Sequence, residues 1–88
     1  MADRKLLFTA QGWRSYERWP ARDIRVLKAA NKMINAALKD PFAGLGKPEP
    51  LKHGLQGLWS RRITQEHRLI YSVTDEALVI VQVGTHYE

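Results

Sequence analysis

The sequence predicts an α+β domain in which two N-terminal helices pack on a small, mainly antiparallel sheet, in the order β-α-α-β-β-β. Three observations lead to this fold class. Residues 21–39 form the longest amphipathic stretch and repeat their apolar positions with the period of a helix. Three strand-like segments follow, at 58–64, 67–73 and 77–83, and the turns between them are short enough for antiparallel hairpins. A further strand-like segment, residues 5–9, precedes the helices.

The length and composition are those of one ordinary globular domain, residues 1–88. Hydrophobic residues make up 44% and charged residues 26% of the chain, which is unlike a disordered protein. No window approaches the roughly 20 apolar residues of a membrane-spanning helix, and no signal peptide is recognisable. Cys is absent, which excludes disulfides and thiolate metal sites. We therefore expect a cytoplasmic protein with no membrane partner.

The two helices are expected at 11–19 and 21–39. Pro20 separates them, because its ring favours an extended residue before it. In the second helix, one half of the helical wheel is apolar and the other half is basic. Asp40 and Pro41 end this helix. Its basic residues are Arg22, Arg25, Lys28, Lys32 and Lys39.

The net charge of +5 predicts a polyanionic partner. Residues 1–46 carry nine Lys and Arg against four Asp and Glu, whereas residues 47–88 carry five of each. The basic side of the second helix has two interpretations, which stay open here. It is either a solvated face opposite the core or a surface that contacts phosphates. Charge alone does not choose between RNA, DNA and an acidic protein.

Residues 41–57 are expected to form a loop, because Pro and Gly recur throughout the segment. Within it, Pro48 and Pro50 fix the backbone on both sides of Glu49. A carboxylate held in this way suits a positioned base, and an exposed loop glutamate is the plainer alternative.

Alternation along the strand at 67–73 sorts its side chains by face. Leu69, Tyr71 and Val73 are mostly apolar, which indicates that their side faces the helices. Arg68 is then expected on the open side of the sheet. The pattern of the preceding strand does not settle its orientation, so a position of Arg62 beside Arg68 stays open.

Glutamate, arginine, lysine and histidine together suffice for a metal-free ribonuclease. RNA carries its own nucleophile, the ribose 2′-OH; a glutamate can accept its proton, and a histidine can protonate the leaving 5′-oxygen. Arginine and lysine can stabilise the charge that develops on phosphorus. The composition permits this chemistry but does not demonstrate it. The histidines lack metal-ligand spacing, so we expect neither a metal nor a cofactor.

Two segments make the sequence similar to a known family. The run from Pro41 to His53 contains Lys-Pro-Glu-Pro-Leu-Lys-His, and the run from Gly57 to Tyr71 contains Trp-Ser-Arg-Arg-Ile. These runs and the closing His86-Tyr87 resemble the YoeB (Txe/YoeB) family of bacterial toxins, within the RelE-like superfamily. The resemblance extends over about residues 5–87 and implies a microbial-RNase-like RelE fold.

The resemblance implies the toxin of a type II toxin-antitoxin system, acting as a ribosome-dependent endoribonuclease that cuts mRNA in the ribosomal A site and blocks translation. Matched by position, Glu49 is the general base, Arg68 stabilises the phosphate and His86 is the general acid. The supporting or RNA-binding positions are Lys52, His53, Arg61, Arg62 and Tyr87.

The implied partners are ribosome-bound mRNA and a cognate acidic antitoxin, with operator DNA bound only through the antitoxin complex. Whether the protein forms a homodimer stays open. Gly84-Thr85 departs from the basic or aromatic pair expected before His86. The alternative function is a non-catalytic module that binds the ribosome or nucleic acid and is neutralised by an acidic partner.

Overall fold

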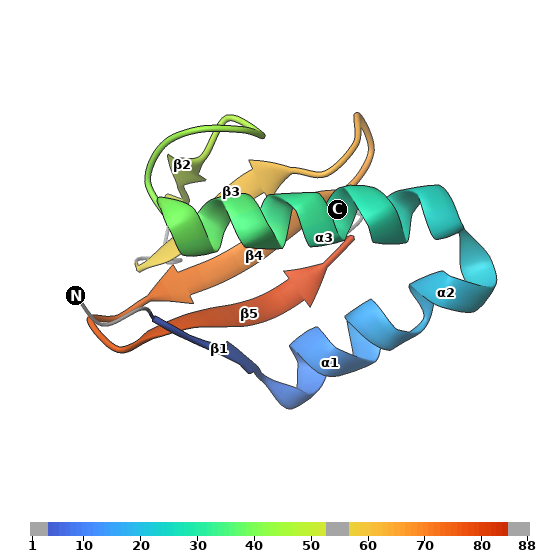
Figure 1. Ribbon diagram of the computed structural model, residues 1–88, viewed down its shortest axis with the longest axis horizontal. Coiled ribbons are helices and arrows are strands. Elements are labelled where there is room, and N and C mark those ends of the chain that lie inside the picture. Colours follow the sequence, from blue (N-terminus) through green and yellow to red (C-terminus); the bar gives the residue numbers. More distant parts are fainter. Residues whose placement is uncertain (1–3, 53–56, 85–88) are drawn as a thin grey trace.

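A five-stranded sheet organises the computed structural model, which describes residues 4–52 and 57–84 (Figure 1). The strands are β1 (Lys5–Phe8), β2 (Glu49–Pro50), β3 (Leu58–Arg62), β4 (Arg68–Val73) and β5 (Ala77–Val83). The helices are α1 (Ala10–Glu17), α2 (Trp19–Arg22) and α3 (Ile24–Lys39). The α+β class and the expected order of the main elements are confirmed.

The strands lie in the order β1-β5-β4-β3-β2 across the sheet. The two hairpins, β3–β4 and β4–β5, are antiparallel, as the short turns predict. The pair β2–β3 is also antiparallel, and β1 runs parallel to β5. The sheet is therefore mainly antiparallel, with its first and last strands side by side.

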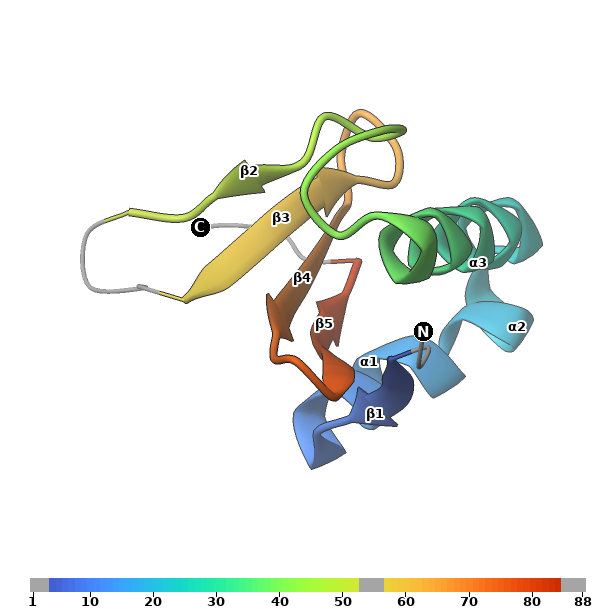
Figure 2. The ribbon, with the colours of Figure 1, turned by 60° about the vertical axis from the view of Figure 1, so that its left-hand side comes forward.

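The helices cover one side of the sheet. Figures 1 and 2 show α3 lying across the strands on one face and α1 running beside β5. Leu69 and Tyr71 of β4 are fully buried in the same core as the inner residues of α3, which confirms the predicted orientation of β4. The buried residues of α3 are spaced three or four apart, as one helical face requires: Val26, Ala30, Ile34 and Ala37.

The boundary between the two predicted helices is wrong by a few residues. Pro20 does not separate them; it lies in the first turn of α2, where the missing N–H removes no helical hydrogen bond. The break falls at Asp23, whose backbone is extended, with φ −159° and ψ 102°. Its side-chain Oδ1 accepts a hydrogen bond of 3.0 Å from the backbone N–H of Arg25 and so caps α3.

Candidate active site

Glu49 lies on β2, inside the segment that the sequence predicts as a loop. This strand pairs with β3, so that Glu49 is opposite Ser60. The next residue but one, Leu51, donates its backbone N–H to the carbonyl of Leu58 at 2.9 Å. A strand of two residues is too short to show a period, which is why the sequence did not predict it. The backbone of Glu49 is thus fixed by pairing as well as by its flanking prolines.

The register between β3 and β4 brings two arginines together. Arg62 is directly opposite Arg68, which settles the question that the sequence left open. Directly opposed residues share a face of the sheet, and Ser60 lies two residues from Arg62 on that face. Glu49, opposite Ser60, therefore belongs to the same face, on the side away from α3. The Nη1 atom of Arg68 lies 3.7 Å from Oε1 of Glu49.

This ion pair is open to solvent. The Glu49 side chain is 63% exposed and that of Arg68 is 32% exposed. Their separation exceeds that of a hydrogen bond, and exposed pairs of this kind stabilise proteins by only about 0–1 kcal/mol. The two groups therefore remain accessible to a ligand. A carboxylate can accept a proton, and paired guanidinium groups can bind a phosphate through charge-assisted hydrogen bonds.

Of the other residues expected at the site, some lie within the described part of the chain and some do not. Lys52 is exposed just beyond β2, three residues after Glu49. His53, His86 and Tyr87 lie outside the described residues. Within residues 4–52 and 57–84, no three His, Asp or Glu side chains gather closely enough to hold a metal ion.

Arg61 departs from its expected role as an RNA-binding residue. Alternation along β3 directs it to the face opposite Arg62, where it pairs with Leu69 and is fully buried. Its guanidinium donates to backbone carbonyls of the segment that follows α3, including that of Leu45 at 2.7 Å. A buried side chain with these partners does not present a charge to RNA, so the expectation is corrected for this position.

The contacts that hold the end of β5 were not predicted from the sequence. Gly84, the last described residue, donates its backbone N–H to the carbonyl of Arg68 at 2.9 Å. Its own carbonyl accepts a hydrogen bond of 2.7 Å from Nη2 of Arg18. The indole N–H of Trp19 donates to the preceding carbonyl at 3.0 Å, and this tryptophan is buried. The chain thus passes beside Arg68 two residues before His86. The one signal in the sequence was the glycine itself, whose φ is +77°.

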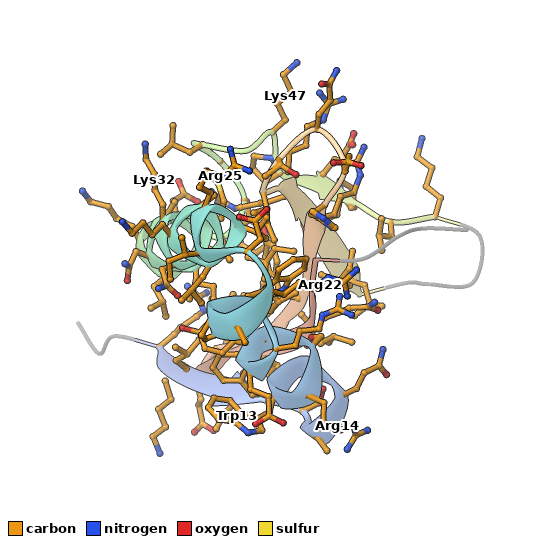
Figure 3. The ribbon with its side chains drawn as sticks, turned by 90° about the vertical axis from the view of Figure 1, so that its right-hand side faces the viewer. Trp13, Arg14, Arg22, Arg25, Lys32 and Lys47 are labelled. Carbon is orange, nitrogen blue, oxygen red and sulfur yellow. The ribbon has the colours of Figure 1, made fainter. Side chains whose placement is uncertain are left out.

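The basic residues of α2 and α3 are all exposed. Figure 3 labels Arg22, Arg25 and Lys32 on the side of the molecule that these helices form. This side is distinct from the sheet face that carries Glu49 and Arg68.

None of the helices in the described ranges is long and apolar enough to cross a membrane.

Comparison with known proteins gives consistent matches over nearly the whole chain. The family model for the YoeB-like toxin of bacterial type II toxin-antitoxin systems matches residues 8–87. Toxin YoeB of Escherichia coli K12 is 49% identical over 83 residues, covering 94% of this chain and 99% of its own length. Toxin YoeB of Streptomyces coelicolor is 51% identical, with the same coverage of both chains.

Solved structures of similar proteins share the fold. The YoeB/ParE toxin from Agrobacterium tumefaciens superposes with a TM-score of 0.86 at 47% identity, covering 94% of this chain and 99% of its own. The YoeB dimer from Staphylococcus aureus gives a TM-score of 0.88 at 34% identity, with 98% and 100% coverage. The toxin from the same organism has also been solved as a YoeB–YefM complex, with a TM-score of 0.85 at 33% identity and the same coverage.

Proposed function

The chain belongs to the family of YoeB-like toxins of bacterial type II toxin-antitoxin systems, and from this we propose that it is a ribosome-dependent endoribonuclease. Its substrate is mRNA in the ribosomal A site, and cleavage there inhibits translation. Such a substrate would place the protein in the cytoplasm. The observation that carries the proposal is the solvent-open Glu49–Arg68 pair, with Arg62 opposite Arg68 on the sheet face away from α3.

In the proposed reaction, RNA supplies the nucleophile. Glu49 accepts the proton of a ribose 2′-OH, and the 2′-oxygen forms a bond to the adjacent phosphorus. The bond from phosphorus to the 5′-oxygen breaks, and His86 donates the proton that the leaving oxygen takes up. The products are a 2′,3′-cyclic phosphate and a 5′-hydroxyl. No step needs a metal or a cofactor.

The cationic groups of the site have a separate role in this proposal. Arg68 stabilises the charge on the phosphate oxygens as the transition state forms, and Arg62 and Lys52 bind the flanking phosphates. His53 and Tyr87 are kept as supporting positions from the family resemblance. The ribosome would align the substrate, by holding the message so that the 2′-oxygen and the leaving oxygen are in line.

The basic residues of the site also indicate how an antitoxin could inhibit the protein. An acidic segment could place its carboxylates against Arg62 and Arg68, where the scissile phosphate would otherwise bind. Opposite charge would speed the encounter, and desolvated ion pairs would set the register. A YoeB–YefM complex and a YoeB dimer are known for the Staphylococcus aureus protein. We extend both associations to this chain, with operator DNA bound only through the antitoxin complex.

Primer extension on a translated mRNA tests the proposed reaction. Glu49→Gln keeps the shape of the side chain and removes the base, so cleavage should slow by roughly 10²–10⁴-fold. Arg68→Ala should cost on the order of 10²-fold or more through lost charge stabilisation. The matched control is Glu66→Gln, an exposed glutamate in the turn between β3 and β4, which should cleave like the wild type.

Three outcomes would refute parts of this proposal. Equal cleavage of naked and ribosome-bound mRNA would contradict ribosome dependence. Continued cleavage of a message with a 2′-deoxy nucleotide at the cut site would exclude the internal nucleophile. Inhibition of translation without any cut would favour the non-catalytic binding module instead.

A further inference from the structure

A buried cation lies directly beneath the segment that leads from α3 to Glu49. Arg61 is fully buried, and its Nη1 and Nη2 atoms donate to the backbone carbonyls of Leu45 and Ala43 at 2.7 and 2.8 Å. Nη2 also donates to the carbonyl of Asp40. These acceptors are neutral oxygens. Burying a charge is costly unless it is well hydrogen-bonded, so the contacts of this guanidinium must be kept in place for the fold to tolerate it.

Tyr71 completes the arrangement from the neighbouring strand. Its hydroxyl accepts a hydrogen bond of 3.1 Å from Nε of Arg61 and donates one of 2.7 Å to the carbonyl of Pro41. Two side chains from β3 and β4 therefore hold four carbonyls of residues 40–45. No helix or strand is formed between α3 and β2, so these side-chain contacts take the place of a backbone ladder.

The held segment is coupled to Glu49 over a very short distance in the chain. The carbonyl of Gly46 accepts a hydrogen bond of 2.7 Å from the backbone N–H of Arg62. Of the two residues between Gly46 and Glu49, Lys47 has a φ of +50° and Pro48 has its φ fixed by the ring. Little freedom remains in the backbone to absorb a displacement of Gly46 before it reaches the backbone of Glu49, which carries the carboxylate.

We propose that Arg61 and Tyr71 are positioning residues, which hold residues 40–46 against the sheet so that Glu49 faces Arg68. This inference rests on the proposed ribonuclease function, in which Glu49 is the base. It replaces the expected RNA contact of Arg61 with an indirect role. A misplacement of a catalytic group by about 1 Å can cost on the order of 10²-fold in rate, whereas binding of the message through exposed cations would be unaffected.

The test uses Tyr71→Phe, which removes both hydrogen bonds of the hydroxyl and keeps the buried ring. Arg61→Lys is the second variant, because lysine keeps the charge but cannot donate to the same set of oxygens. Tyr16→Phe is the matched control: it also removes a tyrosine hydroxyl, one bonded to Asn31 at 2.7 Å on the helical side. All three are compared with the wild type by thermal melting, by kcat and KM on ribosome-bound mRNA, and by hydrogen exchange.

Tyr71→Phe should lower kcat by about 10- to 10²-fold at a temperature where the protein is folded, with KM changed by less than about 2-fold. The backbone amide of Arg62, which donates to the carbonyl of Gly46, should exchange faster, and Arg61→Lys should act in the same direction. Tyr16→Phe should leave kcat and the exchange of the Arg62 amide unchanged. If Arg61→Lys does not fold, Tyr71→Phe carries the test alone.

Three results would overturn the inference. An unchanged kcat in folded Tyr71→Phe would show that Glu49 does not depend on the hydrogen bonds of the Tyr71 hydroxyl. A raised KM with an unchanged kcat would assign Arg61 and Tyr71 to binding. A wild-type protein that cuts no ribosome-bound mRNA would instead refute the proposed function. Exchange of the Arg62 amide would then decide alone whether Tyr71 holds residues 40–46 against the sheet, and unchanged exchange would refute that support.

Discussion

Replacing Gly84 by alanine tests whether Trp19 fixes the end of β5. The backbone of Gly84 has a φ of +77°, a conformation that residues with a side chain rarely adopt. An added Cβ would lie 2.3 Å from Cζ2 and 2.8 Å from Cε2 of the Trp19 indole. The ring must therefore shift, and it also donates the hydrogen bond to the carbonyl of Val83. The substitution strains the backbone and displaces a buried side chain together.

The chain offers a control that separates these two effects. Gly57 has a similar φ of +85°, and among the described residues no heavy atom would lie within 4 Å of its added Cβ. Gly57→Ala should thus cost only the left-handed backbone strain, about 1–2 kcal/mol of the free energy of unfolding. Gly84→Ala adds an overpacking cost of about 1–3 kcal/mol, for a sum of about 2–5 kcal/mol. The difference of about 1–3 kcal/mol measures the contact with Trp19.

Denaturant unfolding of the wild type and both variants provides the measurement, with thermal melting as a second readout at about 4–8 °C per kcal/mol. In a Trp19→Phe background, the smaller ring should reduce the extra cost of Gly84→Ala, as expected for residues in contact. Equal losses for Gly57→Ala and Gly84→Ala in the protein with Trp19 intact would refute the reasoning. They would mean that the end of β5 adjusts freely around the indole.

Two further predictions concern stability. Gly12→Ala should lower the free energy of unfolding by about 2 kcal/mol or more, measured by denaturant unfolding. The new Cβ would lie 2.2 Å from the backbone carbonyl oxygen of Ile80 and force α1 away from β5. A loss below about 0.5 kcal/mol would contradict this packing. Burial raises the pKa of Tyr71 above its usual value of 10.0. The hydroxyl therefore ionises first in the unfolded chain, and stability should fall as the pH rises from about 10 toward the folded pKa. Tyr71→Phe should show a shallower fall over this interval in pH-dependent melting, and an identical slope would refute the assignment.

Much of the fold could be predicted because it follows from local pattern. The amphipathic period of α3 and the alternation of β4 gave both the element types and the faces that meet in the core. The boundary at Asp23 was missed because a proline is acceptable in the first turn of a helix, so Pro20 did not mark the break. The pair β2–β3 was missed because β2 is only two residues long, and its pairing depends on where β3 lies.

The residues of the candidate site likewise divide into those that the local sequence predicts and those that only the tertiary structure places. The sequence by itself identified Glu49 between two prolines and placed Arg68 on the sheet face away from the helices, because these features depend on a few neighbouring residues. Only the tertiary structure decided that Arg62 lies opposite Arg68, that Arg61 is buried, and that the carbonyl of Gly84 meets Arg18. Strand register is set by packing between segments far apart in the chain, and a shift of one residue would exchange the faces of Arg61 and Arg62. No local pattern carries that information. Two neighbouring arginines therefore differ: Arg62 is an exposed cation, and Arg61 is buried and holds the segment before β2.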